Sequence, residues 1–239
     1  MSARVEDTMQ WLVHSPLFFV LLTLIAYRTG REVRDRTGGH ALAQPVLIAV
    51  VLVGGVISLL GVEYDDYRAG TEMIAFWLGP ATVALAVPLH RQAHRLRGFV
   101  VPMLVAVPLG AAVSVATGVV VVHALGGGEE LARTVAPKAT TTPVAIALAD
   151  TVGGLPPLTA VLAILVGILG AVAGPAVLTL VRVRDERARG LALGAVSHGI
   201  GTSRALLEDE TEGAFAGLSM GLTALATSIL LPLLLALLL

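Results

Sequence analysis

The segment Pro137–Pro157 reads PKATTTPVAIALADTVGGLPP and lies between long apolar segments that are expected to cross a bilayer. It is too polar to be an ordinary spanning helix. Pro143 cannot donate a backbone N–H, three threonines precede it, and the Gly-Gly pair at 153–154 and the Pro-Pro pair at 156–157 are turn signals. Broken backbone is tolerated at membrane depth only where it is buried in protein or lines a watery cavity. The segment is therefore a candidate binding site.

The composition is that of an all-α, polytopic membrane protein. Hydrophobic residues make up 56% of the 239 residues, charged residues make up 14%, and the mean hydropathy is +0.85. A soluble domain carries about 25% charged residues. The absence of cysteine excludes a disulfide framework and a thiolate metal site. The first apolar run ends without a small-residue cleavage site, so we expect no cleaved signal peptide and place the protein in the cell membrane.

Apolar segments on either side of the central one predict about seven spanning helices, since most approach the roughly 20 residues that a span needs. They are Trp11–Tyr27, Ala41–Leu60, Thr71–Leu89, Gly98–Leu125, Leu155–Val181, Leu191–Leu207 and Ala214–Leu239. Arginines gather in the loops at 28–36, 91–97 and 182–189. The positive-inside rule makes these three loops cytoplasmic, and the acidic loops at 63–72 and 129–130 then face outward.

The predicted sides of these loops determine the expected path of the central segment through the membrane. Gly98–Leu125 ends outside and Leu155–Val181 ends inside, so the chain between them must enter and leave on the outer side. The simplest arrangement is a re-entrant hairpin in which residues 135–149 dip in, with a break at Thr140–Pro143, and residues 150–157 return. The alternative is a full span combined with one misassigned arginine loop.

A second interrupted segment is Leu191–Leu207, which contains SHGIGTSR at residues 197–204. Two glycines, a histidine and an arginine are costly in lipid, so we expect them to face the protein interior or a cavity. His198 and Arg204 are six residues apart and would lie on opposite faces of a straight helix, but the break at Gly199 and Gly201 can bring both toward one cavity. Gly199, Gly201 and Thr202 of the same motif join the candidate site.

A related interruption, LGPAT, occurs at residues 78–82, so Gly79 to Thr82 repeats the G-x-x-T spacing of Gly199 to Thr202. We therefore expect inverted repeats over residues 11–125 and 133–239, one copy of the motif running inward and the other outward. Pro80 and Thr82 then join the candidate site. A competing similarity, between PATVALA starting at residue 80 and PVAIALA starting at residue 143, pairs the interruption at residues 78–82 with the central hairpin instead.

Five motifs together resemble the LrgB/CidB family of bacterial membrane proteins. The resemblance covers the chain from about residue 41 to the C-terminus. Related sequences include the plastid glycolate/glycerate translocator of plants, whose C-terminal part is LrgB-like. It implies one LrgB-like transmembrane domain over residues 1–239. One departure is PKATTTP, where the family pattern is PKSVTTP. The motifs are LGPATVALAVPL (78–89), PKATTTPVAIAL (137–148), GGLPPLTA (153–160), GILGA (167–171) and SHGIGTSRA with EGAF downstream (197–205 and 212–215).

The resemblance implies two functions. Some members are linked to pyruvate or lactate exchange, which implies a secondary transporter of small monocarboxylates of the glycolate, glycerate, pyruvate and lactate class, in a proton-coupled form and with an LrgA/CidA-like membrane subunit. The bacterial members were named for effects on murein hydrolase activity and lysis, which implies a non-transporting regulator that acts through a holin-like partner. A scaffold does not need broken, polar segments at membrane depth, so the residues favour the transporter.

A small carboxylate needs a positive charge and hydrogen-bond donors. Lys138 is the only lysine in the chain and directly precedes the hydroxyls of Thr140, Thr141 and Thr142 at Pro143. The alternative is a lysine that anchors a helix end at the interface. His198 is the candidate proton acceptor. Arg204 is either a fork for the carboxylate or an anchor at the outer end of its segment, near the acidic residues 208–212.

Enzyme-like patterns do not make this chain an enzyme. Residues 217–221 fit G-x-S-x-G, but a nucleophile elbow requires a strand before the serine, and these residues lie in a long helical segment. Gly213, Gly217 and Gly221, like Gly170 and Gly174, instead form small-residue grooves for another helix. We expect no cofactor, no metal site and no nucleic-acid partner. The expected partners are a small carboxylate, membrane lipid, an LrgA/CidA-like subunit and further copies of the chain.

Overall fold

The structure is a computed structural model that describes residues 15–37, 43, 45–77, 80, 83–84, 86–91 and 98–239. Every element of regular secondary structure in these residues is helical. The chain forms two compact units, an N-terminal unit of residues 1–84 and a C-terminal unit of residues 85–239. Each unit is described by itself.

The N-terminal unit is built on the contact of one long helix with shorter ones. Its helices are α2 (Pro16–Arg36), α3 (Pro45–Leu59), α4 (Tyr64–Gly70) and α5 (Glu72–Phe76). Ser15 caps α2 by accepting a hydrogen bond from the backbone N–H of Phe18. The ring of Phe19 is buried beside Gly70, and the hydroxyl of Thr23 lies 2.9 Å from that of Tyr67. These contacts fix α4 against α2.

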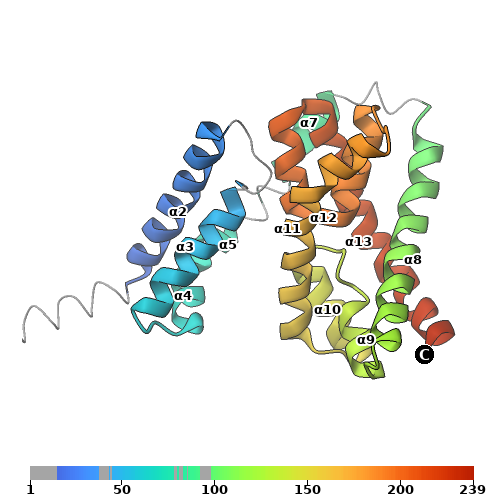
Figure 1. Ribbon diagram of the computed structural model, residues 1–239, viewed down its shortest axis with the longest axis horizontal. Helices are drawn as coiled ribbons and strands as arrows, with labels where there is room; N and C mark the ends of the chain where they lie inside the picture. Colours follow the sequence, from blue (N-terminus) through green and yellow to red (C-terminus); the bar gives the residue numbers. More distant parts are fainter. Residues whose placement is uncertain are drawn as a thin grey trace, which may run out of the picture. The chain divides into compact units, whose positions relative to one another are not determined.

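The C-terminal unit contains three helices that are long and apolar enough to cross a membrane, and in the described residues these are the helices of that kind. They are α8 (Val100–Ala124), α11 (Pro156–Leu180) and α13 (Glu210–Leu238). The shorter helices of the unit are α7 (Ala86–Arg91), α9 (Glu129–Val135), α10 (Thr142–Val152) and α12 (Glu186–Glu208). In Figure 1, α9 and α10 lie at one end of the three long helices and α12 lies at the other.

The first hairpin consists of α9, the loop 136–141 and α10 (residues 129–152). Pro143 lies in the first turn of α10, where a missing N–H costs nothing, and Gly153 ends α10 with φ 75°, a left-handed conformation that glycine adopts without strain. The chain then returns to where it entered. Thr134 accepts at its hydroxyl from the Leu155 N–H (2.9 Å) and at its carbonyl from the Thr159 hydroxyl (2.9 Å).

The second hairpin is α12 itself. Its regular helix is interrupted at His198, which has φ 41° and ψ −127°, so residues 186–197 and 199–208 form two halves. A Cβ on Gly201 would lie 2.6 Å from the carbonyl oxygen of Leu193, eight residues earlier. In a straight helix these residues would be about 12 Å apart along the axis. Leu193 also packs with Ala205. The second half therefore folds back along the first.

The contacts of α13 follow both halves of this hairpin. Gly190 and Gly194 in the first half touch the backbone carbonyls of Glu212 and Ala216, so the first half and α13 run in the same direction. In the second half, Leu206 lies on Gly213, whereas Gly199 faces Met220. The second half therefore runs antiparallel to α13. We expected residues 191–207 to be one interrupted helix that runs outward, but the structure returns this segment to the end from which it started.

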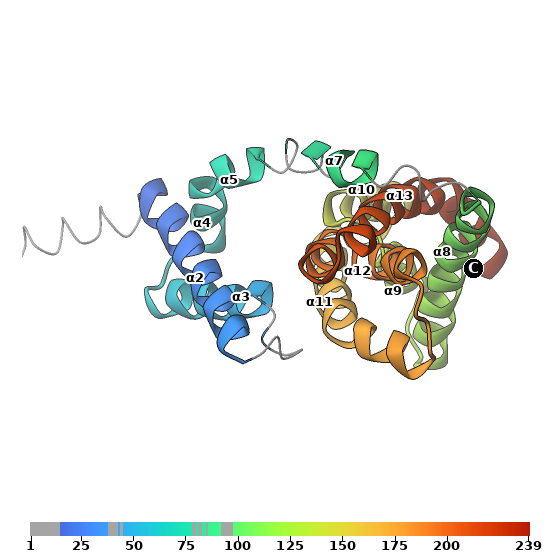
Figure 2. The same cartoon turned by 90° about the horizontal axis from the view of Figure 1, so that it is seen from above.

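The two hairpins fill the space between α8 and α13 from opposite ends. Leu191 of the second hairpin packs with Met103 and Val107 of α8 and with Phe215 of α13. At the other end, Ala132 and Ala136 of the first hairpin pack with Val115, Val119 and Val122 of α8 and with Leu231 and Leu235 of α13. Figure 2, which looks along the long helices, places α9 and α12 in the same central region between α11 and α8. The two tips therefore point toward each other.

Charged residues gather at the end where α12 begins and ends. Arg189 forms an ion pair with Glu212 (3.2 Å), Arg91 lies 3.7 Å from Glu210, and the guanidinium of Arg187 lies over the ring of Phe99 at 4.5 Å. Arg91, which precedes α8, and Arg187 and Arg189 in the first turn of α12 thus lie at one end of the unit, and the positive-inside rule predicts their loops on one side of the membrane. The acidic residues at 208–212 lie at this end too, which the sequence argument had placed outside.

Asp185 fixes where α12 begins. Its carboxylate accepts hydrogen bonds from the backbone N–H groups of Arg187 (2.9 Å) and Ala188 (3.3 Å), which is the role of a helix N-cap. The side chain of Arg187 donates to the same carboxylate at 2.7 Å. That hydrogen bond, followed by those from the backbone, lowers the pKa of Asp185 to about 2. The charge stays in place at any physiological pH.

Candidate substrate site between two hairpin tips

Lys138 lies at the tip of the first hairpin and reaches across to α8. Its ammonium donates a hydrogen bond to the backbone carbonyl of Ser114 (2.6 Å) and lies 3.5 Å from the Ser114 hydroxyl. Gly118 leaves room for this side chain, since a Cβ there would be 2.7 Å from Nζ. Ser114 is near the middle of α8, so the ammonium lies in the interior of the unit and not at a helix end. An ammonium has three N–H groups, and one remains for a ligand.

The three threonines that follow Lys138 have different roles. The hydroxyl of Thr140 is buried and donates to the carbonyl of Pro137 (2.9 Å), so it holds the shape of the tip. Thr141 and Thr142 are half-buried, and their hydroxyls have no hydrogen bond to the protein among the described residues. Pro143 is exposed. Of these three threonines, Thr141 and Thr142 are therefore the ones whose hydroxyls are free to donate to a ligand.

His198 forms the tip of the second hairpin in a conformation that costs free energy. A positive φ is uncommon outside glycine, and such strained residues cluster at functional sites. The ring is buried against Gly167 of α11, with Nε2 3.0 Å from the carbonyl oxygen of Ala163. A carbonyl oxygen only accepts, so Nε2 carries the proton and Nδ1 is left as the atom that can take one up.

The glycines beside His198 serve the fold-back. Gly199 is exposed at the tip, and Gly201 is buried against Leu193, where a side chain would not fit. The hydroxyl of Thr202 donates to the carbonyl of His198 (2.8 Å) and so closes the first turn of the returning half. Thr202 thus shapes the tip in the same way as Thr140 does on the other hairpin.

Not every predicted site residue reaches the tips. Arg204 is buried in the returning half of α12 and forms an ion pair with Glu208 (2.9 Å), on the way back to the charged end. This arrangement is the anchor that we gave as its alternative role. Pro80 is exposed and belongs to the N-terminal unit, and Thr82 lies outside the described residues.

The helices that return from each tip both begin in the interior. The N-terminus of α10 is at Thr142, and the returning half of α12 starts at residue 199. Each N-terminus carries a partial positive charge from its unpaired N–H groups. Two such ends that approach each other from opposite sides, with the ammonium of Lys138 beside one of them, create a region suited to an anion.

Three polar residues of this region were not predicted from the sequence. Ser114 holds Lys138, while Thr223 and Thr227 are buried on α13. A signal for the last two was present, because Ser219, Thr223 and Thr227 recur every four residues in an apolar segment and so share one helix face. Ser219 lies next to α12 and donates to the carbonyl of Leu191 (2.7 Å).

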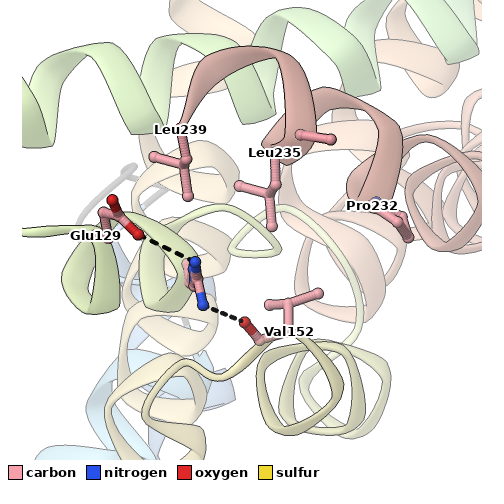
Figure 3. Close-up of a pocket in the computed structure, with 7 residues that line it drawn as sticks. Glu129, Val152, Pro232, Leu235 and Leu239 are labelled. Carbon is pink, nitrogen blue, oxygen red and sulfur yellow. Dashed lines mark hydrogen bonds and ion pairs between the residues drawn. The ribbon is translucent and has the colours of Figure 1, made fainter.

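A pocket of about 370 Å³ opens at the end where α9 begins. The guanidinium of Arg133 donates hydrogen bonds to Glu129 (3.1 Å) and to the carbonyl of Val152 (3.4 Å), and Figure 3 marks both with dashed lines at Glu129 and Val152. The pocket is lined by Glu129, Arg133, Val152, Pro232, Leu235, Ala236 and Leu239. The end of α13 therefore lies beside the base of the first hairpin, where α9 begins and α10 ends.

Comparison with known proteins gives consistent results over most of the chain. A family model described as the LrgB-like family matches residues 23–237. The protein named "Uncharacterized protein YxaC" of Bacillus subtilis (strain 168) is 36% identical over 217 residues, which are 91% of this chain and 94% of that protein. "Antiholin-like protein LrgB" of Bacillus mycoides (strain KBAB4) is 29% identical over 218 residues, which are 91% and 95% of the two chains. No solved structure matches the chain.

Proposed function

Because this chain belongs to the LrgB-like family of membrane proteins, we propose that it is a secondary transporter of small monocarboxylates across the cell membrane. The substrates are of the glycolate, glycerate, pyruvate and lactate class. The substrate binds between the tips of the two hairpins, and an LrgA-like membrane subunit works with the chain. No cofactor and no catalytic group take part in this cycle.

One observation carries the proposal, namely that two half-helices begin in the interior of the unit. Helices broken at mid-depth place their N-terminal partial charges on an anionic substrate in other secondary transporters. Here α10 and the returning half of α12 provide two such ends. We propose that both hairpins are re-entrant and enter from opposite faces of the membrane, so that each tip is covered from one side. Movement of one hairpin then opens the site to one side at a time.

Groups beside these ends support a carboxylate in particular. Lys138 supplies a full positive charge close to α10, and Thr141 and Thr142 supply hydroxyl donors. The acidic residues of the described chain that form ion pairs lie at the ends of helices and not at the tips. In a proton-coupled cycle, Nδ1 of His198 takes up the proton, because Nε2 already carries a proton that it donates to the carbonyl oxygen of Ala163.

The names of relatives support a second function, since several of them are called antiholin-like protein LrgB. In that function the chain regulates murein hydrolase activity and lysis through a holin-like partner and transports nothing. Its arrangement of hydroxyls around two interior helix ends would then have no use.

Uptake into proteoliposomes decides between the two functions. We expect labelled glycolate, pyruvate or lactate to accumulate in vesicles that contain the chain, alone or with its LrgA-like partner, above the level in empty vesicles. A series of external pH values, with His198→Gln as the comparison, tests the proton-coupled form, because glutamine keeps a hydrogen bond to Ala163 but cannot titrate. Absence of uptake in every combination, with the chain correctly folded, would leave the regulator as the function.

A further inference from the structure

We propose that Thr223 of α13 donates a hydrogen bond to the carboxylate, so that α13 forms a third wall of the site between the two tips. This inference rests on the proposed function and adds a residue that neither the sequence motifs nor the family resemblance points to. It assigns a binding role to a helix that otherwise looks like a plain apolar span.

The position of Thr223 follows from its neighbours along one face of α13. One turn before it, the sulfur of Met220 lies 4.0 Å from the position that a Cβ on Gly199 would take, so Met220 reaches the tip of the second hairpin. Two turns after it, Leu231 packs on the first hairpin. Residues three or four apart share a helix face. Thr223 and Thr227, both buried, therefore face inward at the level between the two tips.

The hydroxyl of Thr223 stands out chemically. Its Oγ1 is buried and has no hydrogen-bond partner among the described residues, and the residue is only 1% exposed. Helical threonines commonly donate to the carbonyl four residues back, and Thr134, Thr159 and Thr202 in this unit do so. Buried hydroxyls without a partner are rare in folded proteins because they cost free energy. A bound ligand that accepts a hydrogen bond removes this cost.

The surroundings select an anion as that ligand. The groups at this level are donors, namely the N–H groups at the start of α10 and of the returning half of α12 together with the ammonium of Lys138. Among the described residues, the other buried hydroxyl without a hydrogen-bond partner is that of Ser197 on the second hairpin. Its Oγ lies against Gly170 of α11, so it is wedged between helices and does not face α13. Thr223 is thus the hydroxyl that completes the ring of donors.

The test compares three variants of the full chain in detergent and in proteoliposomes. Thr223→Val removes the hydroxyl without changing the shape, Thr223→Ser keeps it, and Thr117→Val is the matched control, because Thr117 is exposed on α8 and bonds to Val113 of its own helix (2.7 Å). Tm is measured with and without the carboxylate that the parent transports, and KM for uptake is measured with the same carboxylate.

We expect Thr223→Val to have an unchanged or higher Tm without ligand, because an unsatisfied buried hydroxyl has been removed. Its KM should rise about tenfold or more, the range expected for a lost hydrogen bond to a charged group, and the carboxylate should raise its Tm less than that of the parent. Thr223→Ser and Thr117→Val should behave like the parent in both measurements.

A lower Tm of Thr223→Val without ligand, together with an unchanged KM, would overturn the inference and make Thr223 a packing residue. An unchanged KM at any Tm, while the parent takes up the substrate, contradicts this inference alone and leaves the proposed function standing. A parent chain that neither takes up a carboxylate nor gains Tm from one contradicts the proposed function, and the inference falls with it.

Discussion

Lys138 shows how one residue can tie a hairpin tip to a spanning helix. Its ammonium is held by the carbonyl of Ser114, which is already part of the backbone ladder of α8, and it passes over Gly118 to reach it. A lysine that only anchored a helix end would extend to the surface, as long basic side chains do when they can. The sequence alone allows both roles, and the inward direction of the side chain favours a role in the site.

We predict that Lys138→Ala raises KM for carboxylate uptake more than Lys138→Arg does. Alanine removes the positive charge from the tip, whereas arginine keeps it but places it on a planar fork that fits less well over Gly118. The change for alanine should be about tenfold or more. The measurement is the initial rate of uptake as a function of substrate concentration, with equal amounts of protein in the vesicles. If both variants match the parent, Lys138 is an anchor only.

At the scale of elements, glycines decide how closely the second hairpin approaches its neighbours. Gly190 and Gly194 bring the backbone of α12 against carbonyls of α13, and Gly170 and Gly174 receive Ser197 and Leu193 on α11. The small-residue groove predicted for Gly170 and Gly174 is therefore used within the chain. Gly213, from the other predicted groove, packs on Leu206 of the same hairpin. Such close packing is what drives helices together in lipid.

We predict that Gly194→Ala lowers the free energy of unfolding by about 1–3 kcal/mol, because the added Cβ would fall on the carbonyl oxygen of Ala216 and force the helices apart. Gly110→Ala is the matched control. Gly110 is a helical glycine of α8 with open space around it, so alanine there should be neutral or stabilising by about 0.5–1 kcal/mol. Thermal unfolding in detergent measures both. Equal effects of the two substitutions would mean that α12 and α13 are less closely packed than described.

Local signals in the sequence located the break of the first hairpin but not its limbs. Pro143 and the Gly-Gly pair at 153–154 mark the start and the end of α10, so the predicted break at Thr140–Pro143 coincides with the observed start at Thr142. We expected residues 135–149 to dip in and residues 150–157 to return, but α9 enters and α10 returns. In the second hairpin, the predicted break at Gly199 and Gly201 lies next to the observed one at His198. The fold-back depends on contacts between residues such as Gly201 and Leu193, which hydropathy does not report. Thr223 was missed in part for the same reason: the four-residue spacing of Ser219, Thr223 and Thr227 marks a shared helix face but does not show what that face contacts.

At the scale of the whole molecule, the two hairpins determine which helix ends lie at the same end of the C-terminal unit. With α12 folded back, the described part of the C-terminal unit has three helices long and apolar enough to cross a membrane, so we expect the start of α8 and the end of α13 to lie on opposite sides. Glu129 at the start of α9 and Leu239 line one pocket, while Arg91 and Glu210 form an ion pair at the other end, where Arg187 also lies. The positive-inside rule predicts that this second end is cytoplasmic. Inverted repeats over residues 11–125 and 133–239 stay a prediction, because the motif at 78–82 falls largely outside the described residues.

We predict that single cysteines at Arg187 and Glu210 are labelled from the cytoplasmic side only and that one at Glu130 is labelled from outside only. The chain has no cysteine of its own, and these side chains are exposed or form ion pairs at the surface, so each substitution should cost little. A membrane-impermeant maleimide, applied to whole cells and to inverted vesicles, measures the sides. Labelling of Arg187→Cys and Glu210→Cys from opposite sides would mean that α12 crosses the membrane.

The packing of the first hairpin also sets the order in which the protein can be assembled. Ala132 and Ala136 have core partners on α8, which is synthesised before them, and on α13, where Leu231 and Leu235 are synthesised well after them. Each helix of the hairpin is too short to span a bilayer by itself. The hairpin therefore stays unburied on one side until α13 has been made, and a nascent chain that stalls before α13 leaves Ala132 and Ala136 without their core partners on that helix.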